Sequence, residues 1–569
     1  MIERRTLLKG LAAAVALPAL AGCSGRKDGP AAGGGGEDLR DAILYRLKTP
    51  RSIDPFDADA AGLAVASQLF DPLMRYDFDT SELVCHVAES VEMNEDATAL
   101  TFHLRHDLTF SNGDAVDAAS FKRAWERLVD PDSAAARLYE GSPWAYLLTL
   151  VEGYDALSKG TANELAGLTC PDEATLRVQL SKSYADFPLL CAHPALSPVP
   201  ASAVEDAEAF HVCPIGNGAF SLVNAWDGKE ALTFKRVEGY VDPISTGAVP
   251  ESDGSSGAVA SEPIASARFI FDDDSSSAYK RLEAGDIDVS EVPVEQLEGA
   301  EDAFGPKTDG LALESGSHLL STPEPTVVFL TCNMTESPFD NADVRRALSL
   351  AIDREALCDK VYRGAAAPAT SAVPPCIATD GDVSWSYASY DPERAKQFLE
   401  LHYPADEDGT RKLEVTIVCS KDGADAKLMD AVAADLKAVG VSLKTEAVDW
   451  DELVSRFRTG DFACGLTSWT PDAPSLDSAL YPLFRSGVAA AGNYAHYADV
   501  EVDAALDRAR TTVDTAARRQ ALSRALRIAG EASPIIPLAV PVRTVATSDR
   551  VTSLAIDSYG RPDLASATF

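Results

Sequence analysis

The chain has 569 residues, an apolar content of 46% and a formal net charge of −38 at pH 7. A negative field of that size repels phosphate backbones, so the composition argues against nucleic-acid binding. The apolar content excludes a disordered chain and predicts a globular body of two to four domains with large cores.

The first 22 residues are typical of an export signal that ends in a lipoprotein cleavage site. Ile2–Gly10 carries the positive charge, and the apolar segment Leu11–Leu20 is too short to span a bilayer. The run Leu20-Ala21-Gly22-Cys23 has the small residues and the cysteine of a bacterial lipobox, so Cys23 is the predicted lipidation site. The pair Arg4-Arg5 resembles a twin-arginine signal, and the general secretory route is the alternative.

Residues 23–38 are rich in glycine and have almost nothing to bury, which predicts a flexible linker. After the leader, no segment approaches 18 unbroken apolar residues, so we expect no membrane span. The sequence therefore predicts an extracytoplasmic protein, in the periplasm or on the cell surface, that is held on the cell membrane by the lipid on Cys23.

Nine further cysteines occur at wide, irregular spacing, which does not predict a disulfide framework. Cys191 with His193, and His211 with Cys213, supply the ligand types of a tetrahedral zinc site. The single residue within each pair departs from the usual ligand spacing, so half-buried cysteines are the preferred interpretation. We expect no metal and no other cofactor.

The front of the body is predicted to mix short strands with an amphipathic helix. Ala42–Arg46 is a predicted strand, and Ala99–Leu104 and Thr175–Leu180 alternate as strands do. Ala118–Val129 carries apolar residues at helical spacing. Ala195–Val204, rich in proline and serine, is interpreted as a crossing between domains.

In the middle of the chain, Ile215–Leu222 predicts a turn that leads into a strand, with Leu232–Arg236 as its hairpin partner. The turn lacks the third glycine of a dinucleotide loop, so phosphate binding is not expected. Pro243–Pro263 is low in complexity and predicts a surface loop. Residues 268–289 follow the pattern of a β-α-β unit.

From Thr326 onward, strands and helices alternate as in an α/β domain. The predicted strands are Thr326–Thr331, Leu413–Val418, Val441–Glu446, Phe462–Ser468 and Ile535–Val545. The predicted helices are Asn341–Ala351, Arg354–Tyr362, Glu393–Leu401, Ala424–Val439, Glu501–Arg510 and Ala516–Gly530. Asp353 is a plausible N-cap between the first two helices.

The clearest candidate site follows the predicted strand Phe462–Ser468. Gly465 lies within that strand, where a glycine often marks close approach by a ligand or another backbone. Trp469 and Asp472 come just past the strand end, where loops on a rigid scaffold carry function. An aromatic face beside a carboxylate suits an organic cation such as a peptide amino terminus. The alternative is that Trp469 is core and Asp472 caps a turn.

Phe110–Pro131 and Asn333–Pro375 resemble the family 5 solute-binding lipoproteins of ABC importers, whose members bind oligopeptides, dipeptides or nickel complexes. The most specific match is the predicted helix pair at Asp343–Glu355. Further matches are Ile215–Phe220, Trp469–Asp472 and Ser533–Pro537. The similarity covers nearly the whole body in the right order.

The resemblance implies an α/β fold with two lobes, like that of class II (cluster C) periplasmic binding proteins, with an accessory domain on the first lobe. The first lobe would comprise residues 39–69, 198–331 and 532–569, the accessory domain 70–197, and the second lobe 332–531. In peptide-binding relatives an aspartate after a tryptophan takes the ligand's amino terminus, and the strand before it pairs with the ligand backbone. The matching aspartate is Asp472. The other expected ligand contacts are Gly465, Ser468, Trp469, Asn493 and Tyr494.

The expected function is a monomeric binding protein that captures a peptide or other small solute and hands it to the permease subunits of an ABC importer. The same fold binding a nickel complex, or acting as a ligand sensor, is the alternative. An enzyme is disfavoured because the sequence has neither a Gly-x-Ser-x-Gly elbow nor a His-Glu-x-x-His helix, and we assign no catalytic residue.

Overall fold

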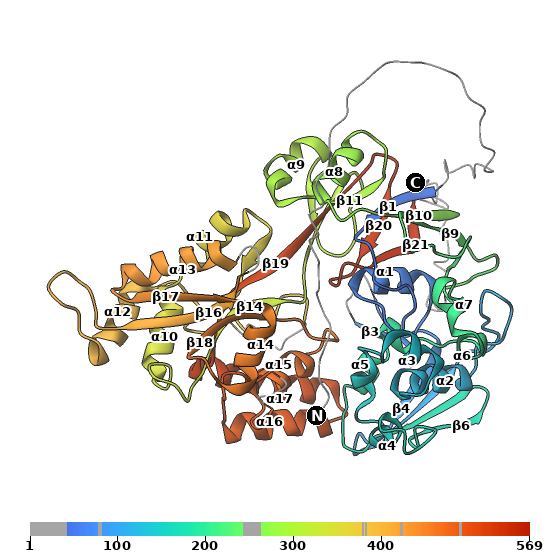
Figure 1. Cartoon of the computed structure of the whole chain (residues 1–569), viewed down its shortest axis with the longest axis horizontal. Coiled ribbons are helices and arrows are strands. Elements are labelled where there is room, and N and C mark those ends of the chain that lie inside the picture. Colours follow the sequence, from blue (N-terminus) through green and yellow to red (C-terminus); the bar gives the residue numbers. More distant parts are fainter. Residues whose placement is uncertain are drawn as a thin grey trace, which may run out of the picture.

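The computed structural model describes residues 42–77, 82–242, 263–377, 381, 384–421, 425–488 and 492–569. The predicted leader, the linker and Cys23 lie outside these ranges, as does most of the expected surface loop after Pro243. Two lobes lie side by side, and the long strand β19 (Ile535–Thr547) runs from one to the other (Figure 1). This confirms the expected two-lobed α/β architecture.

One 13-stranded sheet passes through both lobes, in the path order β17-β16-β18-β14-β19-β11-β1-β10-β9-β8. Its first-lobe strands are β1 (Ala42–Leu47), β8 (Phe220–Leu222), β9 (Ala231–Arg236), β10 (Ser266–Phe271), β11 (Val289–Glu291), β12 (Lys307–Asp309) and β13 (Leu319–Pro323). Its second-lobe strands are β14 (Val327–Cys332), β15 (Ala366–Pro368), β16 (Glu414–Ser420), β17 (Ser442–Val448) and β18 (Cys464–Trp469).

Strand β19 belongs to both lobes. Residues 535–541 pair with β14 and β15, and residues 542–547 pair with β13 and β11. The expected boundaries at 331/332 and 531/532 assign β14 and all of β19 to the first lobe. Strand β14 pairs with β18 along its whole length on one side and with the first half of β19 on the other, so the sheet continues across these boundaries, and they stay a prediction.

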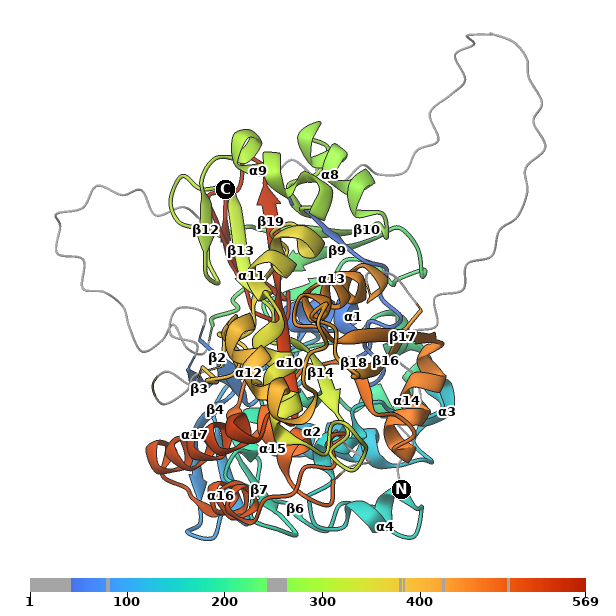
Figure 2. The same cartoon turned by 90° about the vertical axis from the view of Figure 1, so that its left-hand side faces the viewer.

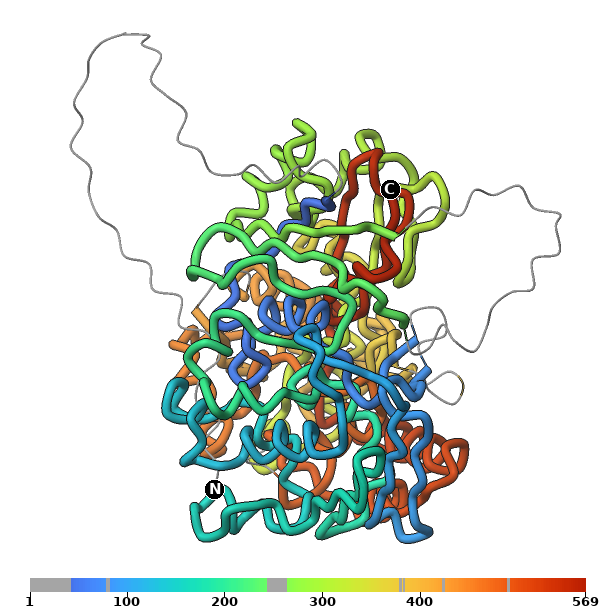
Figure 3. Tube along the Cα trace, turned by 90° about the vertical axis from the view of Figure 1, so that its right-hand side faces the viewer, coloured from blue at the N-terminus to red at the C-terminus, as the bar shows by residue number. Residues whose placement is uncertain are grey.

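The accessory region of the first lobe has its own four-stranded sheet, in the order β4-β5-β7-β6. The strands of the accessory region are β2 (Met74–Tyr76), β3 (Leu83–Cys85), β4 (Ala88–Met93), β5 (Ala99–Leu104), β6 (Leu168–Asp172) and β7 (Thr175–Gln179). Strands β2 and β3 pair with each other outside the four-stranded sheet. Its helices are α2 (Ala118–Val129), α3 (Ala134–Tyr139), the short 3₁₀ segment Ala145–Leu148, α4 (Tyr154–Ser158) and α5 (Phe187–Leu190). Figure 3 shows this side of the molecule in blue, teal and green.

Helix α2 shows why these elements form where they do. Asp117 accepts a hydrogen bond from the Ser120 backbone and closes a capping box, which satisfies the amides at the start of the helix. Phe121, Trp125 and Leu128 are buried on one face. They join a continuous hydrophobic core that extends through the accessory sheet into the first-lobe sheet. The accessory region and the first lobe are therefore one packed unit.

The remaining first-lobe elements are α1 (Ala60–Leu69), α6 (Ser202–Glu205), α7 (Ala207–Val212), α8 (Ser275–Glu283), α9 (Leu297–Phe304), β20 (Ser553–Ile556) and β21 (Pro562–Thr568). Helix α1 ends against the turn at Gly216 and Gly218. A Cβ on Gly216 would lie 1.8 Å from the carbonyl oxygen of Leu69, so only glycine fits there. The glycines of this turn thus serve backbone packing.

The second lobe carries helices on both faces of its sheet (Figure 2). The helices are α10 (Ala342–Ala351), α11 (Arg354–Leu357), α12 (Pro392–His402), α13 (Asp425–Ala438), α14 (Trp450–Thr459), α15 (Leu476–Phe484), α16 (Val500–Thr511) and α17 (Thr515–Ala532). One core packs α10, α12 and α13 against the sheet, and another packs α15, α16 and α17. Within the described residues, no helix combines the length and apolar character needed to cross a bilayer.

The helix pair α10 and α11 anchors the strand that joins the lobes. The buried Arg345 donates to the carbonyl oxygens of Ala532 and Ser533 at 2.7–3.2 Å. The buried Arg354 donates to the carbonyl oxygen of Pro537 at 2.6 Å, and burial lowers its pKa to about 10. The segment singled out by family resemblance therefore holds the start of β19 in place.

Candidate functional site

Strand β18 is paired along its full length on one side only. All six of its residues oppose β14, whereas on the other side β16 pairs only with Cys464 and Gly465. In the part of the chain that the structure describes, no strand pairs with residues 466–469 on that second side. The end of β18 is therefore an open sheet edge.

The alternation of backbone hydrogen bonds between β18 and β14 shows which residues of β18 turn their backbone groups toward the open edge. Asn333 donates its backbone N–H to Ala463 at 2.9 Å, so the next opposed pair, Cys332 and Cys464, is not hydrogen-bonded. Because the phase alternates, the backbone groups of Leu466 and Ser468 also point away from β14. The pairing of Val418 with Gly465 uses the N–H of Leu466, which β16 accepts, so the C=O of Leu466 and both backbone groups of Ser468 face the open edge. Ser468 is exposed there.

Gly465 faces β14 and lies behind the open edge. A Cβ at this position would meet the ring of Phe457 at 2.3 Å and the side chain of Val418 at 3.2 Å. The missing side chain therefore lets helix α14 pack on the strand, and the closely approaching group is an aromatic ring of the protein itself. Its expected contact with a ligand stays a prediction.

Trp469 and Asp472 have different surroundings. The half-buried Trp469 packs at the rim of the core under α15 and donates Nε1–H to the carbonyl oxygen of Ser478 at 3.1 Å. Asp472 accepts a hydrogen bond from the Tyr146 hydroxyl at 2.6 Å. Tyr146 lies in the accessory region, so this contact joins the two lobes. The cap of the following helix is Ser475 and not Asp472.

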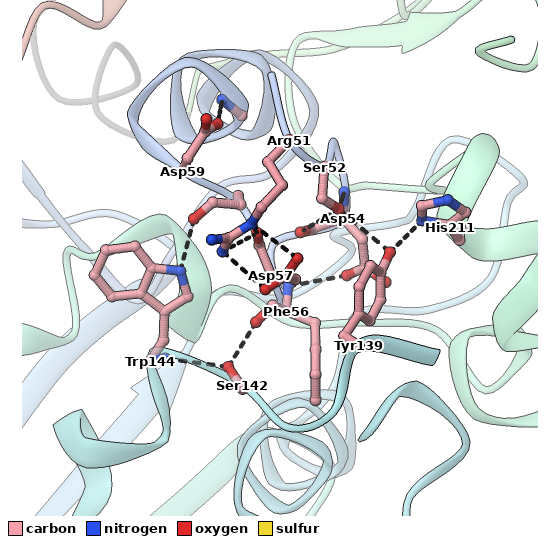
Figure 4. Close-up of polar contacts among 12 residues, drawn as sticks. Arg51, Ser52, Asp54, Phe56, Asp57, Asp59, Tyr139, Ser142, Trp144 and His211 are labelled. Atoms are coloured by element: carbon pink, nitrogen blue, oxygen red, sulfur yellow. Dashed lines mark hydrogen bonds and ion pairs between the residues drawn. The ribbon is translucent and has the colours of Figure 1, made fainter. Parts of the chain in front are cut away.

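The first lobe holds Tyr146 through the segment just before it. Ser142 donates to the carbonyl oxygen of Phe56 at 2.5 Å, and Trp144 donates to that of Ala58 at 2.9 Å. Figure 4 shows both bonds together with the neighbouring pair of Arg51 and Asp57. The loop after β1 thus fixes the chain that carries the tyrosine opposite Asp472.

A second tyrosine from the first lobe reaches the same loop. Tyr559 donates its hydroxyl to the carbonyl oxygen of Pro471 at 2.9 Å. Burial raises the pKa of Tyr559 well above its usual range, so the hydroxyl stays protonated and donates. Tyr146 and Tyr559 could not be found from the sequence near Asp472, because they lie 326 and 88 residues from their partners.

Asn493 and Tyr494 lie in a loop beside the same strand. The buried Asn493 donates its side-chain amide to the carbonyl oxygens of Arg485 and Tyr497, and accepts from the Tyr497 backbone at 3.0 Å. Its side chain therefore holds its own loop. Tyr494 stacks on Phe457 with ring centroids 5.1 Å apart, directly behind Gly465. Contact of either residue with a ligand stays a prediction.

Charged groups also meet across the lobes beside Asp472. Asp186 pairs with Arg518 at 2.7 Å, and the backbone N–H of Ala185 donates to the carbonyl oxygen of Arg510 at 2.8 Å. Arg510 pairs with Asp477 at 2.8 Å within the second lobe. Nothing in the local sequence pattern of these residues marks an interface, so the sequence alone does not predict their contacts.

The two histidines considered as zinc ligands contact different aromatic side chains. His193 packs on Trp144 with ring centroids 4.5 Å apart, while His211 contacts Tyr139 (Figure 4). Burial lowers the pKa of His193 to about 3. Across the described ranges, no group of three or more His, Cys, Asp or Glu side chains is arranged to hold a metal ion.

Comparisons with known proteins agree on the family. The model of the bacterial extracellular solute-binding proteins, family 5, matches residues 82–491. The glutathione-binding protein GsiB of Escherichia coli (strain K12) is 27% identical over 531 residues, which cover 91% of this chain and 92% of that protein. Its counterpart in Shigella flexneri serotype 5b (strain 8401) is also 27% identical, over 533 residues.

Solved structures share the fold over almost the whole chain. HbpA2 from Haemophilus parasuis has a TM-score of 0.78 at 22% identity, covering 93% of this chain and 99% of that one. The open, unliganded murein tripeptide binding protein MppA has a TM-score of 0.76 at 24% identity, covering 92% and 96%. Haemophilus influenzae OppA in complex with the peptide RPPGFSPFR has a TM-score of 0.62 at 25% identity, covering 94% and 98%. The chain therefore belongs to family 5 of the bacterial extracellular solute-binding proteins, the binding components of ABC importers.

Proposed function

We propose that the protein captures peptides between its two lobes and delivers them to the permease of an ABC importer. The observation that carries this proposal is the open edge of β18, which ends at the loop of Asp472. An extended peptide can add to such an edge as a further strand, with main-chain hydrogen bonds supplying affinity. The C=O of Leu466 and the N–H and C=O of Ser468 supply the backbone groups for this pairing.

Asp472 is the proposed partner of the peptide's α-ammonium group. A carboxylate accepts several hydrogen bonds at once, so the bond from Tyr146 still allows an ammonium to bind. With Tyr146 and Tyr559 contacting the same loop from the first lobe, a peptide in this place contacts both lobes. Binding would then favour the arrangement in which the lobes enclose the ligand.

Small peptides are the ligands that the relatives favour. GsiB is named for glutathione, MppA for a murein tripeptide, and the OppA structure contains a nonapeptide. Glutathione and short α-linked peptides are therefore the first probes. The proposed partners are a peptide and the permease subunits, with no nucleic acid.

The test is a cycle of Asp472→Asn with acetylation of the peptide amino terminus. Each change alone should weaken binding by about 2–5 kcal/mol, roughly 30- to several-thousand-fold, because a buried charge loses its partner. Acetylation should add little further loss in the variant, since both changes remove the same interaction. Isothermal calorimetry on the four combinations measures this coupling.

The control is Asp461→Asn, which removes the same charge at an exposed position just before β18. It should leave the affinity for both peptides unchanged. Full additivity of the two changes in the cycle would show that Asp472 does not meet the amino terminus.

We further propose that lipid on Cys23 holds the protein on the outside of the cell membrane. The lipobox and the glycine-rich linker in the sequence support this anchoring. Cys23→Ala should move the protein from the membrane fraction to the soluble extracytoplasmic fraction. Continued membrane association would refute the anchor. Arg4→Lys with Arg5→Lys separates the routes, because only twin-arginine export depends on that pair.

A further inference from the structure

A small cavity lies between the lobes, beside the Asp472 loop. Its volume is about 40 Å³, and Pro474 lines it from the second lobe. Tyr559 and Arg561 line it from the first lobe, and Tyr559 is the residue whose hydroxyl binds the carbonyl of Pro471. The cavity therefore adjoins the place proposed for the peptide's amino terminus.

Arg561 is held in a fixed direction by the turn between β20 and β21. Asp557 Oδ2 accepts a hydrogen bond from Arg561 Nε at 2.6 Å. Asp557 Oδ1 accepts the backbone N–H groups of Arg561 and Tyr559 at 2.9 and 3.0 Å. The guanidinium carbon lies 5.0 Å from the centre of the Tyr559 ring. Asp557 thus holds both the turn and the guanidinium.

The two terminal nitrogens of Arg561 are available for a ligand. Among the described residues, no atom accepts a hydrogen bond from either of them, although the side chain is only 15% exposed. Neither nitrogen is among the fully buried unpartnered side-chain atoms of the described residues, so a ligand can reach them. A guanidinium with its Nε fixed still presents a pair of N–H groups that match the two oxygens of a carboxylate.

We infer that Arg561 binds a carboxylate on the first residue of the bound peptide, so that the site prefers ligands with an acidic group next to their amino terminus. The inference rests on the proposed function, since it takes the Asp472 loop as the place of that terminus. Two kinds of peptide carry such a group. One begins with Glu or Asp, and the other begins with a γ-glutamyl residue, whose α-carboxylate lies on the carbon that bears the ammonium.

The charges that line the cavity do not favour an anion, so the expected selectivity comes from the geometry of the Arg561 guanidinium. Asp557 balances the charge of Arg561, and Asp77 lines the same cavity, so the surrounding field does not attract an anion. A carboxylate is then held by the paired N–H groups of the arginine. Lysine keeps the positive charge but lacks this geometry, so Arg561→Lys should lose the preference as Arg561→Gln does.

Three tripeptides test the inference by calorimetry: Ala-Ala-Gly, Glu-Ala-Gly and γ-Glu-Ala-Gly. The wild type should bind at least one acidic peptide roughly 10- to 100-fold more tightly than Ala-Ala-Gly, as expected for a hydrogen-bonded charge pair. In Arg561→Gln this ratio should fall toward one, while the affinity for Ala-Ala-Gly stays the same. The matched control is Arg550→Gln, which changes another arginine of the C-terminal segment, paired with Asp288 away from the cavity.

The outcomes separate this inference from the proposed function. If the wild type binds all three peptides equally, Arg561 does not read a carboxylate, although peptide binding stands. If Arg561→Gln weakens all three by the same factor, its role is structural and the inference is wrong. If none of the three binds, the proposed function itself fails. The peptide that the wild type prefers shows which of the two acidic groups is recognised. This comparison uses only the wild type, so it does not depend on whether a variant folds.

Discussion

The accessory region is tied to each lobe by an aspartate–arginine pair, and the two pairs differ in their surroundings. Asp54 and Arg127 join it to the first lobe, with side chains that are 0% and 4% exposed. Asp186 and Arg518 join it to the second lobe at 2.7 Å, with side chains that are 5% and 14% exposed.

The first pair is enclosed in hydrophobic core. Arg127 donates both terminal nitrogens to Asp54 and lies 5.2 and 5.1 Å from the ring centres of Phe56 and Phe210. Both rings belong to the core that unites the accessory region with the first lobe. The pair cannot part without opening that core.

The second pair lies between two separate cores. One core ends on the accessory side, and the other packs α15, α16 and α17 on the second-lobe side. The contacts that cross there include the pair of Asp186 with Arg518 and the bond from the Ala185 N–H to the Arg510 carbonyl oxygen. The Arg510 guanidinium also lies 4.9 Å from the ring centre of Tyr184. The same chemistry is thus part of the scaffold in one place and a separable contact in the other.

The largest expected effect concerns the enclosed pair. Asp54→Ala leaves the Arg127 charge buried without its partner, so the free energy of unfolding should fall by about 3–5 kcal/mol. Urea denaturation followed by circular dichroism measures this loss. Asp155→Ala, which breaks an exposed pair with Lys159, is the control and should leave the unfolding midpoint in place. Equal effects of the two variants would show that burial does not distinguish them.

A smaller effect is expected for the pair between the lobes. Arg518→Ala should weaken the contact between the lobes by about 1–3 kcal/mol, the range for a hydrogen bond to a charged group. Unfolding should change little, because the lobes keep their own cores. Small-angle scattering of the ligand-free protein should give a larger radius of gyration than for the wild type. Arg519→Ala, at the neighbouring position, should not, and a global loss of stability in Arg518→Ala would contradict the comparison.

The smallest effect is a pH dependence of the same contact. Burial raises the pKa of Asp186 from 3.8 to about 6, against the opposing effect of Arg518. The nearby charges of Arg510 and Asp477 act in opposite directions. In the contacting state the carboxyl keeps its proton up to about pH 6, and in the separated state it loses it near pH 4. Contact therefore takes up a proton, is favoured as pH falls from 6 to 4, and has lost this advantage above pH 6.

Scattering between pH 4.5 and 7 tests this dependence, and the radius of gyration should rise with pH. Asp186→Asn keeps the shape of the side chain without its titration, so the slope should vanish in that variant. A slope that persists would assign the titration to another group.

Elements with strong local signals could be predicted from the sequence alone. Ala99–Leu104 and Ala118–Val129 form β5 and α2 with the predicted bounds, since alternation and helical spacing are properties of a short window. Asp353 caps α11 by accepting from the Ala356 backbone at 3.0 Å, as predicted. The sequence pattern does not predict helix α1, because almost all of its residues are apolar and show no helical spacing. It does not predict α15, because Pro482 lies within that helix.

The candidate site divides in the same way. Asp472 could be found from its place after a strand and from family resemblance. Its contact with Tyr146, the open edge at Leu466 and Ser468, and the ring of Phe457 behind Gly465 depend on the tertiary structure. The division of β19 between the lobes does so as well. A short window determines periodicity and caps, whereas strand partners and buried contacts depend on residues hundreds of positions apart, which only the folded chain brings together.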